Sequence, residues 1–525
     1  MTHSRSNLPP EPPSQEELRK ALAEGDPQKV SALIRAGANI HYKRDHGHDA
    51  LLDAIYGRDI TRDPHLLELV TLLVDQGVNV SGVSSYNETA LLVLSRLARF
   101  DAVALLLAAG ADKDQLGWTP LIEAVALGSL ADVEAALADS STLEEKDCWS
   151  RTAWLIAVRT GDIAKAKLLR DHGADIEARG GSGGFWTPPL CYAVDGRHPE
   201  MLRWLLEDGA DVEQTDDRGT TALVRAVEID DIECVDILLA AGADVHAGSS
   251  TKALKEATSR DIVMRLLDAG ADPAQMTYAG QRAVLGLPQI ETTRFVADIP
   301  GNALASVSSD EFKSGFRRSF GKSNPERMDI AFWKSMILSG ASGFEARQGF
   351  EDTCGPCPEA VWSAQRYGQS LTLLPDGRAV QIGGEHEDYY DDDFCIYNDV
   401  IVHERDGTIA IYGYPESVFP PTDFHTATLV GDFIYVIGSL GYRGKRRFGE
   451  TPVYRLDVRT LRMDRLDTSG EAPGWIERHR ADAVGPTGIR VAGGNVVTLR
   501  NGMESRDPTD GSFVLDIERL VWRRE

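Results

Sequence analysis

The chain has 525 residues, of which 42% are hydrophobic and 26% charged, and this is the composition of an ordinary soluble protein with more than one domain. Its formal net charge of -26 disfavours non-specific binding to nucleic acid or to an anionic membrane. We therefore expect neither of these as a direct partner. Another protein, of basic character, is the partner that such a surface would attract.

The N-terminal segment MTHSRSNLPPEPPSQEE has no apolar core, so it is not expected to act as a secretory signal. No run of about 18 apolar residues predicts a membrane-spanning helix. The 6 cysteines are too sparse for a disulfide scaffold in a chain of this length. Together these features favour a cytoplasmic protein.

Residues 1–14 are rich in proline and are predicted to be disordered. From residue 15 to about residue 275 one pattern recurs: a triplet that opens a short helix, a second helix with one apolar face, and a glycine that ends it. The opening triplets begin at Asp49, Thr89, Thr119, Thr152, Pro188, Thr221 and Lys252. The closing glycines are Gly37, Gly77, Gly110, Gly173, Gly209, Gly242 and Gly270. With a first unit that lacks the triplet, this makes about eight units.

One such unit cannot bury its own apolar face and must stack on its neighbours. The triplets, spaced by 30 to 40 residues, resemble the ankyrin repeat, whose signature is a turn, T-P-L, a helix, and a second helix ending in L-L-x-x-G-A. The resemblance implies a curved α-solenoid over residues 15–275 whose concave face and finger-like turns bind proteins. Departures from the pattern near residues 57–64, at the end of the fourth unit and at residues 180–184 are expected to loosen the stack locally.

Six residues in or beside the fingers of neighbouring units are of types enriched at binding hot spots. They are Trp118, Trp149, Arg151, Phe185, Trp186 and Arg218. We interpret them as a partner-binding surface and expect Trp118 and Arg151 to lie side by side. The alternative is that some of these rings only cover the next repeat. Trp154 and Trp204 take core positions of the pattern and are interpreted as packing residues.

Residues 276–365 are interpreted as a helical cap and a joint between two domains. Asn324 followed by Pro325 predicts the start of a helix. Cys354 and Cys357, in the order C-G-P-C, match the thioredoxin redox motif, in which one thiolate attacks and the second cysteine resolves the mixed disulfide. No predicted strand precedes the motif and Pro358 follows it, so a coincidence in a loop is favoured over redox activity.

From residue 366 the hydrophobic period changes from helical to alternating, which predicts strands. Three segments align, with Gly368, His425 and His479 at corresponding positions 57 and 54 residues apart and glycines after each second strand. They resemble the kelch motif, in which each repeat forms one four-stranded blade of a β-propeller. The resemblance implies an all-β kelch-like domain over residues 366–525, with His425 and His479 as framework residues rather than catalytic ones.

Propellers have about 4–8 blades, whereas three repeats occur here, so a partial β-propeller is expected. Its open end could be covered by helices of residues 323–351, in which Phe332, Trp333, Met336 and Ile337 form an apolar face. A second chain could also close it. We favour the first arrangement and expect a monomer, with a homodimer as the alternative.

The segment 385–393, after the glycine pair of the first kelch-like repeat, is dense in acidic and aromatic residues. We interpret six of them as a recognition loop for a basic partner: Glu385, His386, Glu387, Asp388, Tyr389 and Asp391. A solvated loop without a ligand is the plainer interpretation. A Ca²⁺ or Mg²⁺ site at Asp391, Asp392 and Asp393 is a further alternative, although no EF-hand spacing supports it.

Two repeat architectures that commonly bind proteins favour a non-enzymatic adaptor, scaffold or inhibitor, the last including an immunity-type protein that covers a basic target. The alternative is an enzyme that uses Cys354 and Cys357 or a metal in the 385–393 loop. No phosphate-binding loop, dinucleotide-binding motif, zinc-protease motif or catalytic-triad order occurs in a supporting context. We therefore expect neither enzymatic activity nor a cofactor.

Overall fold

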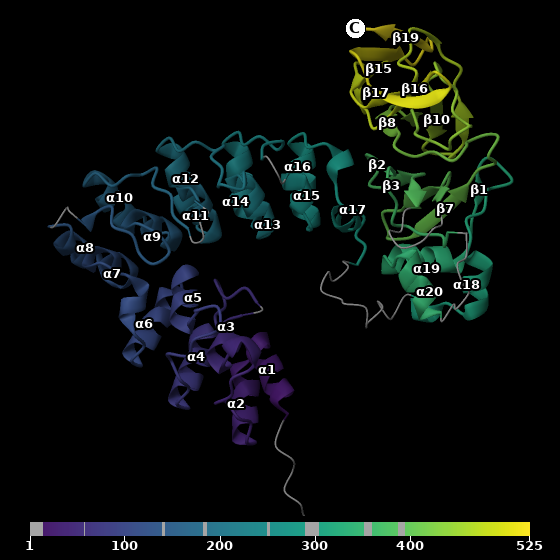
Figure 1. Ribbon diagram of the computed structural model, residues 1–525. Helices are drawn as coiled ribbons and strands as arrows, with labels where there is room; N and C mark the ends of the chain where they lie inside the picture. The colour runs from purple at the N-terminus through teal and green to yellow at the C-terminus, as the bar shows by residue number, and fades with distance from the viewer. Residues whose placement is uncertain are drawn as a thin grey trace, which may run out of the picture. The chain divides into compact units, whose positions relative to one another are not determined.

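The computed structural model describes residues 14–56, 58–138, 142–181, 186–248, 252–288, 304–350, 360–386 and 394–525. The chain divides into two units, Met1–Glu256 and Ala257–Glu525. The first is helical and the second is mostly β-sheet (Figure 1). We describe each unit by itself.

The helical array consists of helix pairs in the order expected from the repeats, and the last second helix, α16, is grouped with the second unit. The first helices are α1 (Gln15–Glu24), α3 (Ala50–Ile55), α5 (Ala90–Arg96), α7 (Pro120–Leu127), α9 (Ala153–Thr160), α11 (Pro189–Asp195), α13 (Ala222–Glu228) and α15 (Ala253–Glu256). The second helices are α2 (Pro27–Arg35), α4 (Leu66–Asp75), α6 (Phe100–Ala108), α8 (Leu130–Ala136), α10 (Ile163–Asp171), α12 (Pro199–Glu207), α14 (Ile232–Ala240) and α16 (Arg260–Asp268).

The opening triplet starts a helix because its first residue is the N-cap. The hydroxyl groups of Thr89, Thr119 and Thr152 each accept a hydrogen bond from the backbone N–H three residues later, at 3.2, 3.2 and 3.4 Å. The closing glycines take a left-handed conformation that strains other residues, as at Gly110 and Gly242, whose φ angles are 92° and 88°. These local rules produce the ankyrin-repeat fold expected for the N-terminal half.

The stack is interrupted between the third and fourth repeats. The first helices contact one another in two runs, α1–α3–α5 and α7–α9–α11–α13–α15. Between the runs, α6 contacts α7, and α5 contacts η2 (Lys113–Leu116), a 3-10 turn in the finger. The triplets at Thr89 and Thr119 are 30 residues apart, the shortest spacing in the array. Because the ankyrin period is about 33 residues, this connection is too short for a full finger, and the second run does not continue the first.

The second unit combines helices with three consecutive β-sheets. The first sheet has the order β1-β7-β6-β3-β2, the second β11-β10-β9-β8 and the third β12-β19-β18-β15-β14. A hairpin sheet, β13-β16-β17, and a short pair, β4-β5, complete it. The helices are α17 (Tyr278–Val284), α18 (Ser309–Gly315), α19 (Ala331–Ser339) and α20 (Gly343–Gly349).

The strand bounds follow the alternating pattern of the sequence. They are β1 (Glu326–Arg327), β2 (Ser370–Leu373), β3 (Ala379–Ile382), β4 (Glu385–His386), β5 (Cys395–Ile396), β6 (Val400–His403), β7 (Ile409–Gly413), β8 (Thr426–Val430), β9 (Phe433–Ile437), β10 (Val453–Asp457), β11 (Met463–Arg465), β12 (Ser469–Gly470), β13 (Trp475–Glu477), β14 (Arg480–Val484), β15 (Gly488–Ala492), β16 (Asn495–Arg500), β17 (Met503–Pro508), β18 (Ser512–Asp516) and β19 (Val521–Arg524). The C-terminal region is therefore all-β from residue 370 onward in the part that the structure describes.

The three sheets pack face to face through two apolar cores. In β9, Ile434 lies in a core with Val402 of the first sheet, whereas the adjacent Tyr435 lies in a second core with Leu515 of the third. Successive residues of a strand point to opposite faces, so the middle sheet is buried on both sides. The described strands form no closed barrel or propeller.

The first strands of the three sheets are joined by a backbone ladder. The Phe424 N–H donates to the Gly368 carbonyl at 2.9 Å, and the Arg478 N–H donates to the Phe424 carbonyl at 2.9 Å. These three residues have φ angles of 62° (Gly368), 47° (Phe424) and 54° (Arg478). They are therefore the structurally equivalent positions, and the alignment of Gly368 with the two histidines is wrong by one residue.

The histidines stand one position later and correspond to Gln369 in the first sheet. Each bonds to a hydroxyl group of the preceding sheet: His425 Nε2 lies 2.8 Å from Ser370 Oγ, and His479 Nε2 lies 3.0 Å from Thr426 Oγ1. Both side chains are buried, at 8% and 6% exposure for His425 and His479. They connect neighbouring sheets, which agrees with the framework role expected of them.

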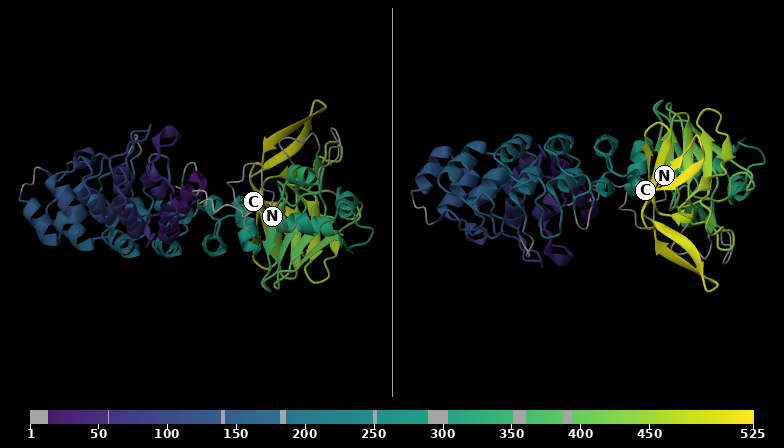
Figure 2. Two further views of the ribbon diagram at one scale, coloured as in Figure 1. Left: turned by 90° about the horizontal axis from the view of Figure 1, so that it is seen from below. Right: turned by 90° about the horizontal axis from the view of Figure 1, so that it is seen from above.

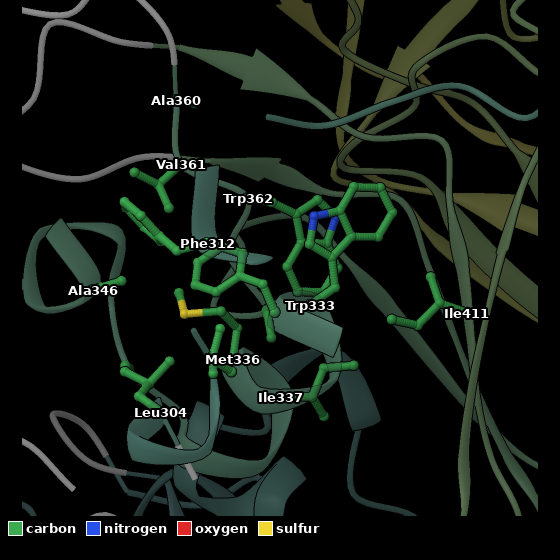
Figure 3. Close-up of a cluster of buried hydrophobic side chains, with 14 of the residues drawn as sticks. Leu304, Phe312, Trp333, Met336, Ile337, Ala346, Ala360, Val361, Trp362 and Ile411 are labelled. Atoms are coloured by element: carbon green, nitrogen blue, oxygen red, sulfur yellow. The ribbon is translucent and has the colours of Figure 1, made fainter. Parts of the chain in front are cut away.

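Helix α19 covers the outer face of the first sheet. Its Phe332, Trp333, Met336 and Ile337 are at most 2% exposed and lie in one apolar cluster with Ile411 of β7 (Figure 3). The apolar face predicted within residues 323–351 thus finds its packing surface on the sheet. The stack of sheets is closed at this end by helices of the same chain.

A buried ion pair fixes this cover. Arg366 Nη2 lies 3.0 Å from Asp399 Oδ2, and its guanidinium lies 3.6 Å from the centroid of the Tyr397 ring. Trp362 Nε1 also donates to Asp399 Oδ2, at 3.0 Å. The Trp362 ring stacks on Trp333 of α19 with centroids 4.8 Å apart. The ion pair between Arg366 and Asp399 and the stacked rings of Trp362 and Trp333 therefore link the helical cover to the first sheet.

The helix start predicted at Asn324 is wrong. Glu326 and Arg327 form strand β1 beside β7, and the next helix begins at Ala331. The Asn324 side-chain amide instead donates to the Met463 carbonyl at 2.8 Å and accepts from the Met463 N–H at 2.9 Å. Because the Asn324 amide bonds to the outward N–H and carbonyl groups of β11, it cannot also cap a helix.

We predict that the second unit loses stability as the pH falls below 6.5. Burial lowers the pKa of His425 to about 3 and of His479 to about 4, from 6.5 for a free side chain. The unfolded chain therefore binds more protons between these values, and stability falls with pH by about 1.4 kcal/mol per pH unit for each histidine. Denaturant unfolding followed by tryptophan fluorescence from pH 7.5 to 4.5 should show this slope.

The matched control is His479→Gln, because glutamine already stands at the equivalent position 369. This variant keeps an amide near Thr426 and removes one titrating group, so its slope should be smaller. An unchanged slope would contradict the assignment.

Candidate protein-interaction surface

The fingers that precede the first helices present side chains at fixed positions. In the third, fifth and seventh repeats the residue two positions before the N-cap has a positive φ: 58° at Asn87, 57° at Ser150 and 76° at Gly219. This residue turns the chain, so the residue just before it stands at the tip of the finger. The tip residues are Tyr86, Trp149 and Arg218. Trp118 and Trp186 come from the intervening fingers and stand one and two residues before their N-caps, Thr119 and Pro188. Together with the tip residues they form what we call the fingertip surface.

The fingertip residues differ in exposure. Tyr86 is 65% exposed and Trp186 38%, and Arg218 is also exposed. Lys146 Nζ lies 5.0 Å from the centroid of the Trp186 ring, and the Trp186 backbone N–H donates to Asp217 at 3.1 Å. An exposed ring held by its backbone loses little entropy when a partner covers it.

Trp118 and Trp149 are half-buried and pack on their own chain. The Trp118 ring meets Phe100 edge-on, with centroids 5.7 Å apart. The Arg96 guanidinium lies 5.2 Å from the Trp149 ring centroid. The alternative considered for the sequence, in which some rings cover a neighbouring repeat, therefore applies to these two.

Tyr86 was not among the residues singled out from the sequence. It stands three residues before the N-cap Thr89, as Trp149 stands three residues before Thr152, so counting back from each cap would have found it. Its ring lies 5.8 Å from that of His46 at the preceding finger. The exposed aromatic residues thus begin earlier in the array than expected.

Arg151 does not belong to an open surface. Its side chain is 2% exposed and pairs with Asp147, whose side chain is fully buried, at 2.6 Å. The guanidinium also donates to the Ser95 carbonyl at 2.8 Å and to the Ser95 hydroxyl at 3.1 Å. Ser95 belongs to α5, on the other side of the break between the two runs of helices. The assignment of Arg151 to partner binding is therefore wrong: this residue joins the two runs.

A second connection between the runs comes from the insertion in the second repeat. Arg62 donates to the Arg197 carbonyl of the sixth repeat, and Arg197 Nη2 lies 3.3 Å from Asp59 Oδ2. The insertion is itself held by Arg99, which donates to the Asp63 carbonyl at 3.2 Å. Residues about four repeats apart in the sequence are thus in contact, and the loosening of the stack near residues 57–64 stays a prediction.

Ion pairs also run along the first helices of the second run. Arg159 Nη1 lies 2.9 Å from Asp195 Oδ2, and Arg225 Nε lies 3.2 Å from Asp195 Oδ1. Burial lowers the pKa of Arg159 to about 10. These side chains form contacts between neighbouring repeats, and their charges are therefore already paired within the array.

The structure describes only some of the other candidate residues. Glu385 and His386 form β4 and are 7% and 2% exposed, so the structure places neither in an exposed recognition loop. Phe185, Glu387, Asp388, Tyr389, Asp391, Asp392 and Asp393 lie outside the described residues, as do Cys354 and Cys357. Within the described ranges no group of three or more His, Cys, Asp or Glu side chains is arranged to hold a metal ion. No helix in those ranges has the length and apolar character needed to span a membrane.

Comparison with known proteins identifies the repeats. Residues 190–277 match the family described as ankyrin repeats (3 copies). Ankyrin repeat protein nuc-2 of Neurospora crassa is 29% identical over 196 residues, covering 36% of this chain and 17% of that protein. Ankyrin repeat, SAM and basic leucine zipper domain-containing protein 1 of Mus musculus is 31% identical over 137 residues, covering 25% and 26%.

These relatives are matched over a small part of their own length. A further one, the probable E3 ubiquitin-protein ligase XBOS32 of Oryza sativa subsp. japonica, is 34% identical over 90 residues, which cover 17% of this chain and 18% of the relative. The crystal structure of the human ASB11 ankyrin repeat domain matches at 21% identity with a TM-score of 0.22, over 49% of this chain and 98% of that one. Residues 190–277 thus match ankyrin repeats, the helix pairs before them follow the same pattern, and such repeats point to interaction with other proteins.

We predict that Arg151→Leu destabilises the helical array. The substitution leaves the Asp147 carboxylate buried without its cation, and removing one partner of a buried ion pair costs about 3–5 kcal/mol. Thermal unfolding followed by circular dichroism at 222 nm should show the loss in the helical transition. Arg218→Leu, a change of the same type at an exposed fingertip, is the control and should leave that transition nearly unchanged.

We also predict that the contact between Asp59 and Arg197 orders the insertion. Asp59→Arg or Arg197→Asp alone places like charges together and should speed amide hydrogen exchange in residues 58–64. The double variant exchanges the two charges and should restore part of the protection, since the contacts of Asp59 with Thr61 and of Arg197 with Asp231 stay lost. Equal exchange rates in all four proteins would show that the ion pair has no such role.

Proposed function

We propose that this chain is a non-enzymatic protein–protein interaction protein, acting as an adaptor, scaffold or inhibitor. The observation that carries the proposal is the fingertip surface, on which Tyr86 is exposed in the third repeat and Trp186 and Arg218 are exposed in the adjacent sixth and seventh repeats of an ankyrin array. Trp, Tyr and Arg are the residues most enriched at binding hot spots. The array supplies a rigid support that holds Trp186 and Arg218 at the spacing of adjacent repeats.

The β-rich region is proposed to be a kelch-like partial propeller that contributes a second binding surface through its loops. Three observations support this: the backbone ladder through Gly368, Phe424 and Arg478, the histidine–hydroxyl contacts between sheets, and the glycines that follow the second strands. A Cβ at Gly438 would lie 2.5 Å from the Ile476 carbonyl oxygen, so the close approach of neighbouring sheets requires glycine there.

The net charge of -26 favours a partner with a basic surface. A cytoplasmic location is proposed with it, since the cysteines that the structure describes, Cys148, Cys191, Cys234 and Cys395, are free thiols. Electrostatic attraction of this kind is weakened by salt. Binding should therefore decrease as ionic strength rises.

The test begins with a pull-down by the full-length protein from its native cell, which supplies the partner for the binding measurement. We predict that Trp186→Ala combined with Arg218→Ala weakens binding of that partner by about 2 kcal/mol or more, which is roughly 30-fold. Isothermal titration calorimetry with the purified partner measures the change.

Tyr367→Ala is the matched control, because Tyr367 is a comparably exposed ring, at 54%, in the β-rich unit. Its affinity should stay close to that of the unchanged protein if the fingertip surface carries the binding. Loss of affinity in the Tyr367 variant alone would place the binding surface in the β-rich unit instead.

A further inference from the structure

The outer edges of the three stacked sheets are covered by other parts of the chain. Strand β1 pairs with β7 at the edge of the first sheet, and β12 pairs with β19 at the edge of the third. The Asn324 amide occupies the edge of β11 in the second. An uncovered strand edge invites pairing with another chain, and these devices prevent it. The hairpin β16–β17 has no such cover on β17 among the described residues.

This hairpin is inserted between β15 and β18, and a two-stranded yellow ribbon projects from the unit in both views of Figure 2. Strand β13 covers the β16 side over Asn495–Val497, and among the strands that the structure describes β17 is the last of its sheet on the other side. Asn501 and Gly502 at the tip have φ angles of 52° and 78°, the pattern of a two-residue type I′ turn. Pairing through this turn sets the register of both strands.

The register defines which backbone groups of β17 face outward. Arg500 pairs with Met503 beside the turn, and Thr498 pairs with Ser505. In a hairpin of this type these pairs exchange hydrogen bonds, and the residues between them turn their N–H and C=O groups away from the partner strand. Glu504 and Arg506 therefore present backbone donors and acceptors at the open edge. The next outward position is Pro508, which has no N–H and limits the edge to these two residues.

The end of the hairpin also exposes apolar side chains. Met503 is 71% exposed and Leu499 is 54% exposed, whereas Val497 at the base is fully buried. A projecting two-stranded ribbon is marginally stable by itself, and additional strands stabilise it. Open backbone groups and exposed apolar side chains thus occur on the same short segment.

The charges of β17 select one way of pairing with a second copy. An antiparallel partner strand must place its outward residues opposite Glu504 and Arg506. A two-fold axis at position 504 sets Glu504 against itself, and an axis at position 506 sets Arg506 against itself; like charges directly opposite are destabilising. An axis at Ser505 instead sets Glu504 opposite Arg506 of the second copy, twice. Glu504 already forms an ion pair with Arg446 of its own chain, so Arg506 of the second copy joins an existing pair. Of the three registers, the axis at Ser505 is the one that sets no like charges directly opposite each other.

We propose that the β16–β17 hairpin is a self-association site, at which β17 pairs with β17 of a second copy about a two-fold axis at Ser505. The result is an intermolecular four-stranded ribbon. This homodimer differs from two half-propellers closing a ring, because helix α19 already covers the first sheet. It also departs from the monomer expected from the sequence.

The test is sedimentation equilibrium of the full-length protein over a wide concentration range. The unchanged protein should pass from the 57.3 kDa chain mass to twice that value as concentration rises. Arg506→Glu sets carboxylates opposite each other and should weaken the dimer about tenfold. Glu504→Arg sets cations opposite each other and also removes the ion pair with Arg446, so it should weaken the dimer at least as much. An equimolar mixture of the two variants pairs cations with carboxylates and should restore it.

Arg519→Glu, an exposed charge change outside the hairpin, is the control and should leave the association constant unchanged. Arg506→Pro removes an outward N–H without removing a hairpin bond, and it should abolish the dimer while the circular dichroism spectrum stays the same. A mass of 57.3 kDa at all concentrations would overturn the proposal. So would a dimer that the Arg506→Pro variant still forms, or a mixture that associates no better than either variant alone.

Discussion

Neither a helix pair of the array nor a sheet of the second unit can bury its own apolar residues, and each is completed only by its neighbour. In β9 the adjacent residues Ile434 and Tyr435 belong to different cores, one shared with the preceding sheet and one with the following sheet. The first helices of the array depend on one another in the same way. Because both units are stacks, their weak points are the ends and any interruption.

Polar contacts are concentrated at these weak points. Arg151 and Arg197 join the two runs of helices at the interruption of the array, and Arg366 fixes the helical cover at the first sheet. A buried ion pair adds little net stability compared with an apolar contact, but an arrangement that leaves either charge unpaired is costly. These residues therefore select one geometry at places where apolar stacking alone would allow several.

The repeats could be predicted because their signals are local. A Thr that caps a helix and a Gly that ends one are recognised from a few neighbouring residues. The alternation of apolar and polar residues that marks a strand needs only a slightly longer segment. In the sequence, the break between Thr89 and Thr119 appears only as a short spacing between triplets. How the two runs of helices then meet depends on contacts between residues far apart in the sequence. Asn324 was misinterpreted for the same reason, since its partner Met463 is 139 residues away. The one-residue error at Gly368 arose because Phe424 takes a conformation that favours glycine.

Residue type alone could not separate the proposed binding surface from the internal framework. Trp and Arg are enriched at hot spots, yet the same rings and guanidinium groups also lock folded chains together. Arg151 at 2% exposure and Trp186 at 38% were equivalent candidates in the sequence and differ in burial in the structure. What distinguishes them is what each side chain contacts, because Trp118 takes the same position before a helix cap as Arg151. Arg151 pairs with Asp147 and bonds to Ser95 of the neighbouring run, whereas the Trp186 backbone is held by Asp217 and its ring is exposed. Recognition by an array of this kind therefore depends on the residues that the stack positions but does not bury.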